Sequence, residues 1–398
     1  MSKVISVNCG SSSLKFQLIE MPSEEVISSG IVERIGLETG IFTIKFGNQK
    51  VKNELEIKDH TQAVHLLLDA LVEHKIVAQL DEISAAGHRV VQGGDKFSGS
   101  VVVDEENAKI VSDLAELAPL HNKANLIGYY AFKEALPSIG HIFVFDTAFH
   151  QTMTAESFLY PVPYSWYTDY QVRRYGAHGT SHQYVARRVL ELMDKPTEGS
   201  RIITCHLGNG ASISAVKDGK CVNTSMGFTP LGGIMMGTRS GDVDPAIIPY
   251  MVKKLGISAQ EVIDKLNKES GMLGVSQISS DARDIEDAAH EGKQRAVETQ
   301  ALYVNRLVNV IGGYVFQMGG VDSIVFTAGV GENDGSLRAL TLKALEEVLG
   351  LDVDYDLNAK SRGKEIQLTT SKSKVQAWIV PTNEELMIAR DAVKLLNV

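Results

Sequence analysis

A run of small and hydroxyl-bearing residues near the N-terminus could bind an anion. The run, with its flanks, reads Asn8-Cys9-Gly10-Ser11-Ser12-Ser13-Leu14-Lys15. Gly10 would let the backbone approach a ligand closely, the serines offer hydroxyl donors, Lys15 adds positive charge and Asn8 offers an amide oxygen. These groups suit a polyphosphate accompanied by a hydrated divalent ion. For this stretch alone, an ordinary Gly/Ser turn is the alternative interpretation.

A second glycine-rich run repeats the pattern in the other half of the chain. Residues 202–216, like residues 4–19, read as a strand, a small-residue tip and a second strand. A further pair of related stretches, 142–150 and 324–333, reads as buried strands that end in small-residue loops. These similarities indicate a duplicated α/β domain, with one glycine-rich tip from each copy facing the other across a cleft.

Two arginines, Arg89 and Arg239, each adjoin a glycine-rich loop. A guanidinium group offers a planar fork that matches carboxylate or phosphoryl oxygens, and glycine neighbours let a ligand come close. A surface salt bridge is the commoner role of an arginine. The loop setting of both residues favours anion binding.

Several common nucleotide- and metal-binding motifs are absent from the sequence. Neither the GxxxxGK[ST] phosphate loop nor the protein-kinase HRD signature occurs. His178 and His182 have i, i+4 spacing but lack the glutamate of a zinc HExxH motif. Gly208 and Gly210 lack the third glycine of a dinucleotide fingerprint. If phosphate is bound, binding by a hairpin tip is the mode that is left.

The composition is that of an ordinary globular protein. The chain has 398 residues, of which 44% are hydrophobic and 22% charged, which is enough for two domains with substantial cores. A net charge of -10 argues against a nucleic-acid partner, so any anionic ligand must be held by local arginine, lysine, backbone amides and metal. Three cysteines cannot all pair and none forms a CxxC motif, which favours a reducing compartment.

The hydropathy pattern argues against a membrane partner. The first apolar stretch becomes polar at Asn8, too early for the core of a signal peptide. The longest apolar run, 308–330, is interrupted by Gln317 and Asp322, and reads as a buried helix, a turn and a core strand. We therefore expect a cytoplasmic protein.

Periodicity supplies the elements that must position the candidate residues. Besides the two hairpins, strands are expected at 30–35, 41–46 and 83–91. Helices are expected at 61–78, 104–118, 122–136, 183–193, 245–255, 259–268, 285–290, 296–316, 336–349 and 383–396. Thr180 or Ser181 is a plausible cap for the helix that begins near residue 183, and the last helix has Asn383 as its expected cap.

Short motifs that run in order along the whole chain carry a family resemblance. They are NCGSSSLK (8–15), GHRVV (87–91), LAPLHN (117–122), FDTAFH (145–150), HGTSH (178–182), HLGNG (206–210), GTRSGD (237–242), GVGEN (329–333) and PTNEE (381–385). Together they resemble the acetate kinase family. Some relatives carry Phe before the first histidine of HGTSH, whereas this chain has Ala177, which would enlarge the acyl pocket.

The resemblance implies a fold and a reaction. The fold is α/β, with two duplicated ribonuclease H-like domains around an interdomain cleft, in the actin-like ATPase superfold that includes Hsp70 and the sugar kinases. The N-terminal domain would span 1–150, completed by a C-terminal helix at 384–398. A nucleotide-binding domain at 151–383 would also form a homodimer contact. The reaction is reversible, Mg²⁺-dependent, in-line transfer of the ATP γ-phosphoryl group to acetate, which gives acetyl phosphate and ADP.

The resemblance also implies roles for particular residues. Asn8 and Glu384 would hold Mg²⁺ or Mn²⁺. Lys15, with Ser11 and Ser13, would bind the nucleotide phosphates. The ATP site would be lined by His206, Leu207, Gly208, Asn209, Gly210, Asp281, Ala282, Arg283, Gly329, Val330, Gly331, Glu332 and Asn333.

The remaining implied roles concern the acid and the transferred group. Arg89 would bind the substrate carboxylate, and its methyl group would contact Val91, Leu120 and Pro230. His178 and Arg239 would stabilise the transition state, and Asp146 is the position usually assigned as the catalytic acid or base. Because acetate is already ionised at neutral pH, it needs no general base. We therefore interpret Asp146 as an orienting group for Arg239, for a metal-bound water, or for both.

Three alternatives stay open at the level of the sequence. Propionate or another short-chain acid could replace acetate, because one methylene group is worth only about 1 to 3 kcal/mol of discrimination. A chaperone-like or filament-forming ATPase would use the same fold as a nucleotide switch. A sugar or glycerol kinase would share the fold, but its hydroxyl nucleophile would need a true base.

Overall fold

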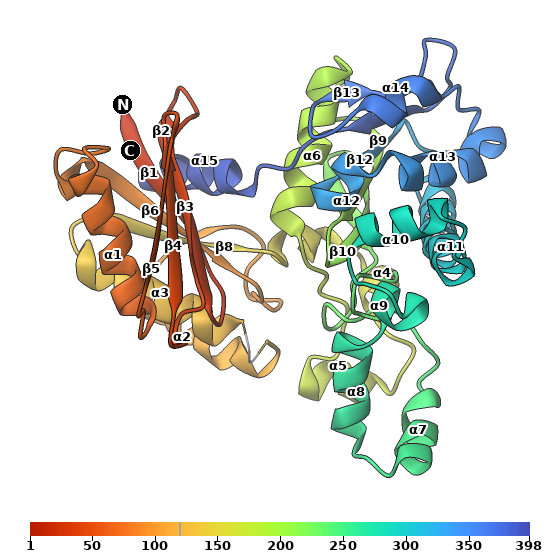
Figure 1. The fold of residues 1–398 in the computed structure, drawn as a ribbon, viewed down its shortest axis with the longest axis horizontal. Helices are drawn as coiled ribbons and strands as arrows, with labels where there is room; N and C mark the ends of the chain where they lie inside the picture. The colour runs from red at the N-terminus through yellow and green to blue at the C-terminus, as the bar shows by residue number, and fades with distance from the viewer. Residues whose placement is uncertain (119–120) are drawn as a thin grey trace. The chain divides into compact units, whose positions relative to one another are not determined.

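The computed structural model describes residues 1–118 and 121–398. These residues form two compact units, each with its own sheet (Figure 1). Unit 1 comprises Met1–Gln151 and Asn383–Val398, and unit 2 comprises Thr152–Thr382. The last helix of the chain therefore belongs to the unit that contains the N-terminus.

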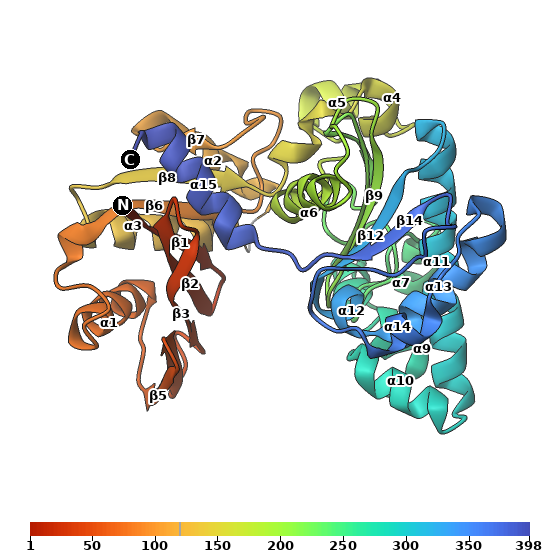
Figure 2. The same cartoon turned by 90° about the horizontal axis from the view of Figure 1, so that it is seen from above.

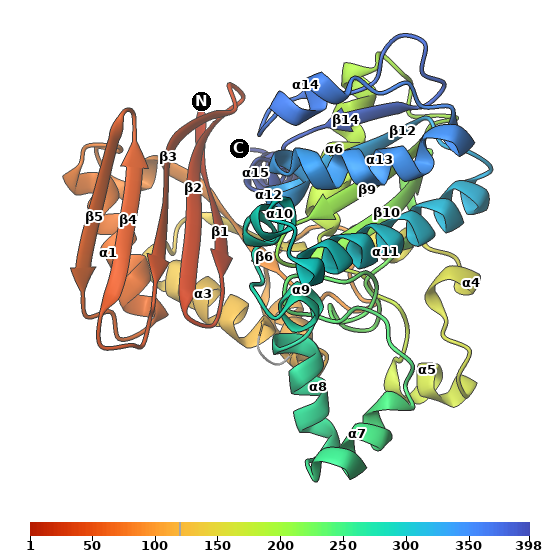
Figure 3. The same ribbon diagram turned by 45° about the vertical axis from the view of Figure 1, so that its right-hand side comes forward.

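Unit 1 is built on an eight-stranded sheet with the order β5-β4-β3-β2-β1-β6-β8-β7. The strands are β1 (Ser2–Cys9), β2 (Ser13–Met21), β3 (Glu25–Glu33), β4 (Gly40–Phe46), β5 (Gln49–Leu55), β6 (Ile83–Val90), β7 (Val101–Val102) and β8 (Gly140–Phe145). The first five strands form an antiparallel meander, which Figure 3 shows side by side, while β6 pairs in parallel with both β1 and β8. The expected N-terminal hairpin is confirmed, with Asn8 paired to Lys15.

Helices cover both faces of the sheet in unit 1. The α-helices are α1 (His60–Glu73), α2 (Glu105–Asp113), α3 (Asn122–Ala135) and α15 (Glu384–Leu396), with short 3₁₀ turns at Leu80–Glu82, Leu114–Glu116 and Ala148–Thr152. Successive residues of β6 show that α3 and α15 lie on opposite faces, because Gly87 meets Ile388 of α15 while His88 meets Tyr129 of α3. Figure 2 shows α15 across the strands β6 and β8.

Gly87 lets α15 pack closely on β6. A Cβ atom at this position would lie 2.2 Å from Cγ2 of Ile388. We expect Gly87→Ala to lower the free energy of unfolding by about 1 to 3 kcal/mol, the usual cost of overpacking. Urea unfolding followed by far-ultraviolet circular dichroism measures this change. Gly99→Ala is the matched control, because a Cβ atom there meets nothing within 4 Å, and an equal loss in both variants would contradict the packing argument.

The core of unit 1 contains a histidine pair between β6 and β8. Nε2 of His88 lies 3.0 Å from Nδ1 of His141, among the rings of Tyr129, Phe132 and Phe143. Burial, and then the charge of His141, hold the pKa of His88 well below its ordinary value of 6.5. His88, which belongs to the GHRVV motif, is thus kept neutral in the core.

This pair makes the stability of unit 1 dependent on pH. Below about pH 6.5, His88 binds a proton in the unfolded chain but not in the folded chain. The free energy of unfolding therefore falls as the pH falls, by up to about 1.4 kcal/mol per pH unit. We expect His88→Gln to flatten the fall in the urea midpoint between about pH 7.5 and 5.5. Circular dichroism is the readout, since Trp166 and Trp378 both lie in unit 2. Equal slopes in the two proteins would contradict this expectation.

Unit 2 is built on a six-stranded sheet with the order β11-β10-β9-β12-β14-β13. The strands are β9 (Arg201–Leu207), β10 (Ala211–Lys217), β11 (Lys220–Thr224), β12 (Ser323–Thr327), β13 (Ile366–Gln367) and β14 (Gln376–Ile379). β9 forms an antiparallel hairpin with β10, and β12 pairs in parallel with both β9 and β14. The order β11-β10-β9-β12-β14 repeats the order β3-β2-β1-β6-β8 of unit 1, so the expected duplication is confirmed.

Unit 2 also has helices on both sides of its sheet, with α6 (Gly179–Leu192) on one side and α11 (Gln294–Met318) on the other. The helices of this unit are α4 (Ala155–Phe158), α5 (Tyr164–Tyr170), α6 (Gly179–Leu192), α7 (Ile247–Leu255), α8 (Ala259–Lys268), α9 (Gly271–Ser276), α10 (Ala282–His290), α11 (Gln294–Met318), α12 (Ala328–Asn333), α13 (Gly335–Leu349) and α14 (Tyr355–Lys360). Alternate residues of β9 divide the two faces. Ile203 and Cys205 join the apolar cluster that includes Leu307 of α11, whereas Thr204 and His206 contact α6.

Three local expectations from the sequence were wrong. The segment 329–333 is not a loop but most of helix α12, whose start is stabilised by the Glu332 side chain accepting the N–H of Ala328 at 2.8 Å. Helix α10 begins at Ala282 rather than at residue 285, because Asp281 is its N-cap. Helix α6 begins at Gly179, so Thr180 and Ser181 lie inside it and are not its cap.

Within residues 1–118 and 121–398, the structure contains no helix with the length and apolar character needed to cross a bilayer. The apolar run 308–330 divides, as expected, into the end of α11, a turn and the strand β12.

Candidate active site

Unit 1 gathers four of the candidate polar residues at one edge of its sheet. Asn8 lies near the end of β1, Arg89 near the end of β6, and Asp146 directly after β8. These three strands are parallel neighbours, so their carboxyl ends meet at the same edge. Glu384 is the first residue of α15, and its electrostatic effect reaches Arg89.

Arg89 is held by a two-pronged ion pair. Its Nε donates to Oδ1 of Asp146 at 2.9 Å, its Nη2 donates to Oδ2 of the same carboxylate, and its Nη1 donates to Oδ1 of Asn8 at 3.2 Å. The side chain of Asp146 is 1% exposed and that of Arg89 is 21% exposed. Although burial opposes the charged guanidinium, the carboxylates of Asp146 and Glu384 raise the pKa of Arg89. Each Nη atom keeps a second hydrogen that can be donated to a ligand.

The carboxylate of Glu384 has the properties of an incomplete metal ligand. Its Oε1 atom is buried and has no hydrogen-bond partner. Burial, with Arg89 partly opposing it, raises the pKa of Glu384 to about 7. A bound cation would replace the missing partner, and carboxylate and amide oxygens are ligands that suit Mg²⁺. The described residues contain no group of three or more His, Cys, Asp or Glu side chains that could hold a metal, so most ligands of such an ion would be water and phosphate.

The hairpin tip between β1 and β2 presents its polar groups to solvent. The N–H of Gly10 donates to the carbonyl of Ser13 at 2.8 Å, and Nε2 of His60 lies 2.8 Å from the carbonyl oxygen of Gly10. Ser11 and Lys15 are exposed, and Ser13 is half-buried. Because Lys15 is the cross-strand partner of Asn8, the two side chains leave the hairpin on the same face.

The three residues expected around the acyl group are distributed over both units. Val91 is half-buried directly after β6, and its N–H donates to Oδ1 of Asn125 at 3.2 Å. Leu120 lies outside the described residues. Pro230 belongs to unit 2, where its carbonyl oxygen accepts a hydrogen bond from Nη1 of Arg239 at 3.3 Å.

Unit 2 brings His178 and Arg239 together beside the tip of the hairpin between β9 and β10. His178 has a left-handed backbone (φ 58°) and immediately precedes α6. A Cβ atom at Gly210 would lie 3.3 Å from Nη1 of Arg239 and 3.8 Å from Nε2 of His178. Because Gly210 has no side chain, space remains between the hairpin tip and these two side chains.

Arg239 is a half-buried cation without a counter-charge. Within the described part of the chain it forms no ion pair, in contrast to Arg89. Burial lowers the pKa of Arg239, which means that its charge is poorly compensated by its surroundings. A guanidinium in this state gains by meeting an anion.

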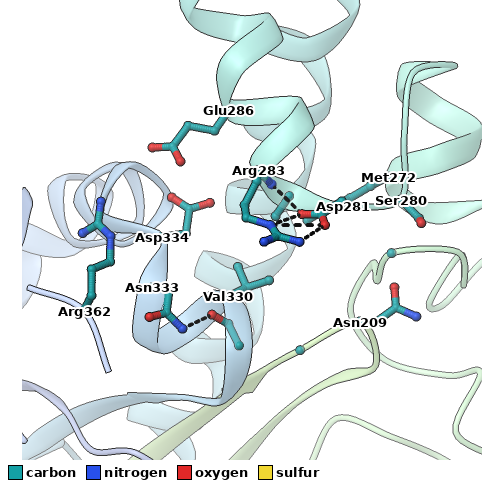
Figure 4. A pocket seen from close by; sticks show the side chains of 14 residues that line it. Asn209, Met272, Ser280, Asp281, Arg283, Glu286, Val330, Asn333, Asp334 and Arg362 are labelled. Carbon is teal, nitrogen blue, oxygen red and sulfur yellow. Dashed lines mark hydrogen bonds and ion pairs between the residues drawn. The ribbon is translucent and has the colours of Figure 1, made fainter. Parts of the chain in front are cut away.

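A pocket of about 680 Å³ lies in unit 2 (Figure 4). This volume suits a nucleotide-sized ligand. The pocket is lined by Gly208, Asn209, Gly237, Met272, Ser280, Asp281, Ala282, Arg283, Glu286, Gly329, Val330, Asn333, Asp334 and Arg362.

The expected nucleotide residues divide into those that line this pocket and those that support it. The lining residues among them are Gly208, Asn209, Asp281, Ala282, Arg283, Gly329, Val330 and Asn333. His206, Leu207, Gly210, Gly331 and Glu332 do not line it. Leu207 is fully buried in the apolar core, and Glu332 accepts hydrogen bonds from the N–H groups of Ala328 and Thr382.

Three charged residues of the pocket were missed from the sequence: Glu286, Asp334 and Arg362. Glu286 lies one helical turn beyond Ala282 on α10, so helical spacing could have identified it had the helix been started correctly. Asp334 follows the GVGEN motif directly and caps α13. Arg362 follows α14, in a part of the sequence without a recognisable motif.

The charges of the pocket are of both signs. Hydrogen bonds from Arg283 lower the pKa of Asp281 to about 2, so this pair is ionised. Burial raises the pKa of Asp334, and burial together with Asp334 raises the pKa of Glu286. In Figure 4, Glu286, Asp334 and Arg362 lie at one end of the pocket, and Asn209 lies at the other.

The fold and the sites define a class of protein. A duplicated α/β fold with a nucleotide-sized pocket in one unit, and arginines that can bind anions in both, suits an enzyme that transfers a phosphoryl group from a nucleotide. The chain belongs to the acetokinase family, whose model matches residues 3–390.

Individual relatives agree with this assignment. The chain is 54% identical over 398 residues to an acetate kinase of Geobacillus sp. (strain WCH70), with 100% of each chain covered. It has the same identity over 397 residues to an acetate kinase of Macrococcus caseolyticus, also with 100% of each covered. The crystal structure of Porphyromonas gingivalis acetate kinase superposes with a TM-score of 0.96 at 44% identity, covering 100% of both chains. A propionate kinase from Francisella tularensis gives a TM-score of 0.93 at 36% identity, covering 99% of this chain and 100% of the other.

Proposed function

We propose that this enzyme transfers the γ-phosphoryl group of ATP reversibly to acetate, giving acetyl phosphate and ADP. Sequence identities of 54% and 44% to acetate kinases, over the full length of the chain, support acetate as the phosphoryl acceptor. The observation that best supports this reaction is that both carboxylate oxygens of Asp146 accept hydrogen bonds from Arg89. Asp146 is thus engaged in holding a guanidinium, which fits an acceptor that is already ionised and needs no base, whereas a hydroxyl acceptor would need one.

The acid binds and reacts as an anion. Arg89, held in one orientation by Asp146 and Asn8, donates its remaining hydrogens to the acetate carboxylate. An oxygen of acetate attacks the γ-phosphorus in line, and the bond from that phosphorus to the β–γ bridging oxygen breaks, which releases ADP. No proton is taken up or lost in this step. Asp146 acts as a positioning residue for Arg89, whereas the sequence led us to expect that it orients Arg239, a metal-bound water, or both.

The approach of two anions is the main obstacle to this reaction. Arg239 and His178 offset the repulsion by donating to the phosphoryl oxygens as negative charge spreads over them. Lys15, Ser11 and Ser13 bind the phosphate chain, and the pocket lined by Asn209, Asp281 and Asn333 holds the nucleoside. Asn8 and Glu384 would hold Mg²⁺, or Mn²⁺ in its place, which supplies positive charge to the phosphates when bound.

A hydroxamate assay with ATP and different acceptors tests the proposal. We expect hydroxamate to form with acetate, less with propionate and little with butyrate, while ADP release should show no reaction with glycerol, whose phosphate ester cannot give a hydroxamate. Propionate as the better acceptor would make this a propionate kinase, as the Francisella relative is named. Slow ATP hydrolysis that acetate does not change would instead favour a nucleotide switch. Phosphorylation of glycerol would favour a hydroxyl kinase.

We further propose that the enzyme is a cytoplasmic homodimer, with contacts made through the 151–383 domain. The supporting observation is that α11 carries apolar side chains at its surface, including Phe316, which is 84% exposed, and Val297, which is 44% exposed. Sedimentation velocity of the full chain measures its oligomeric state. A monomer at all concentrations would contradict the proposal.

A further inference from the structure

A chain of buried hydrogen bonds ends at His178. Oγ1 of Thr204 lies 2.7 Å from Nδ1 of His182, Nε2 of His182 lies 2.7 Å from Oγ of Ser212, and that same Oγ lies 2.8 Å from Nδ1 of His178. Thr204, His182 and Ser212 are fully buried. They come from β9, α6 and β10, so the chain crosses the interface between a helix and a hairpin.

The hydroxyl of Ser212 couples the two rings. A serine hydroxyl has one hydrogen, so Ser212 can donate to only one ring nitrogen and must accept from the other. If Ser212 donates to His178, then Nδ1 of His178 is an acceptor and the proton of a neutral ring lies on Nε2. If Ser212 donates to His182, then Nδ1 of His178 carries the proton. The protonation of His178 is therefore set at the far end of the chain.

Thr204, at the far end of the hydrogen-bond chain, favours the arrangement in which Ser212 donates to His178. Thr204 can donate either to Nδ1 of His182, at 2.7 Å, or to the carbonyl oxygen of Ser214, at 3.5 Å. A contact of 3.5 Å is at the outer limit of a hydrogen bond, whereas 2.7 Å is close to the optimum for a hydroxyl donor. When Thr204 donates to His182, the proton of His182 lies on Nε2 and Ser212 accepts it. Among the described residues, Nδ1 of His178 is the other hydrogen-bond partner of this buried hydroxyl, so the hydrogen of Ser212 is donated to it.

We propose that Thr204, His182 and Ser212 are positioning residues that keep His178 neutral with its proton on Nε2. This inference rests on the proposed function, in which His178 donates to the transferred phosphoryl group. Nε2 is the nitrogen on the side of Gly210 and Arg239, where that group would lie. The chain of hydrogen bonds thus lets an uncharged imidazole donate a hydrogen bond to the phosphoryl group. No ionisation of His178 is then required for transfer.

A second set of contacts fixes the plane of the ring. His178 stacks on His206 with their centroids 4.1 Å apart and their planes 21° apart, and Nδ1 of His206 lies 2.8 Å from Oγ of Ser181. Oγ1 of Thr382 donates to the same serine oxygen at 2.7 Å. The hydroxyl chain would therefore select the tautomer, while the stack holds the orientation.

Nitrogen-15 NMR of the full-length enzyme with labelled histidine tests the tautomer directly, because ring-nitrogen shifts distinguish protonated from unprotonated nitrogen. The signals of His178 are identified by their loss in His178→Gln. We expect an unprotonated Nδ1 and a protonated Nε2 at neutral pH, and a mixture of tautomers in Ser212→Ala. A protonated Nδ1 of His178 in the wild type would overturn the proposal.

Kinetics tests whether the chain matters for transfer. A net hydrogen bond of ordinary strength corresponds to a fall in kcat of about 3- to 10-fold, which we expect for Ser212→Ala and Thr204→Val, with KM values for ATP and acetate within about two-fold. His182→Gln should retain more activity than His182→Ala, because its amide can still donate toward Ser212.

Ser214→Ala is the matched control. Ser214 is also fully buried on β10, but its hydroxyl pairs with Thr224 at 2.9 Å and does not touch the histidines. Equal losses of kcat in Ser212→Ala and Ser214→Ala would overturn the proposal. The NMR shifts are read without substrate, so they decide the tautomer independently. A wild type that fails to phosphorylate acetate would overturn the proposed function instead.

Discussion

Replacing Arg239 with alanine should lower kcat by about 10³-fold, the size of effect seen when a transition-state donor or an arginine at a transferring phosphoryl group is removed. Arg239 is half-buried, forms no ion pair among the described residues and lies beside Gly210 with His178. In the proposed reaction its charge would be compensated as negative charge develops on the phosphoryl group. We therefore expect KM for acetate to change by less than about three-fold, since this interaction is made mainly in the transition state.

Steady-state kinetics with ATP and acetate measures both parameters. Arg187→Ala is the control, because this arginine is exposed on the same unit and lies away from the pocket. Arg239→Lys should recover little activity, since an ammonium group lacks the planar fork of a guanidinium. A rise in KM for acetate that accounts for most of the loss in Arg239→Ala would assign this residue to ground-state binding.

Replacing Asp146 with asparagine should raise KM for acetate by at least about ten-fold and lower kcat/KM by about 10²-fold, because a misplacement of about 1 Å in a binding group has effects of this order. Asparagine keeps one acceptor oxygen and turns an NH₂ group toward the guanidinium, so one prong of the ion pair becomes a contact between two donors. Arg89 would then leave its present orientation. KM for ATP should change little.

A double-mutant cycle separates this positioning role from proton transfer. If Asp146 acts only through Arg89, then Asp146→Asn should lower kcat/KM much less in the background of Arg89→Ala, where KM for acetate is already raised. Kinetics of the two single variants and the double variant gives the coupling. An undiminished effect of Asp146→Asn in that background would mean that Asp146 acts on the substrate itself.

The sequence predicted the residues of unit 1 better than their contacts. Asn8, Arg89, Asp146 and Glu384 stand out by type and by motif, and parallel strands bring the first three to one edge. The ion pair of Arg89 with Asp146 could not be predicted, because the two residues are 57 positions apart and no local pattern links them.

In unit 2, motifs identified one part of the nucleotide pocket and missed another. The stretches HLGNG and GVGEN are visible in the sequence, and both contribute residues to the pocket, although only the first is a hairpin tip and the second lies in α12. Arg362 lies in the pocket only because α13 and α14 return the chain to that place. Leu207 belongs to a motif but packs in the core, since alternate residues of a strand face opposite sides.

The hydroxyl chain behind His178 illustrates the same limit. His182 is visible in the sequence as the second histidine of HGTSH, but its spacing to His178 does not show that a hydroxyl links the two rings. Its partners Thr204 and Ser212 are ordinary strand residues, and only the packing of α6 on β9 and β10 reveals them. Single hydroxyls in a strand carry no sequence signal of this role.

The central proposal is that Arg239 and His178 donate hydrogen bonds to a phosphoryl group as it passes from ATP to a carboxylate. A crystal structure of the enzyme with ADP, aluminium fluoride and acetate tests it most directly. We expect Arg239 and Nε2 of His178 to donate hydrogen bonds to the bound aluminium fluoride. An analogue bound away from Arg239 and His178 would contradict the account.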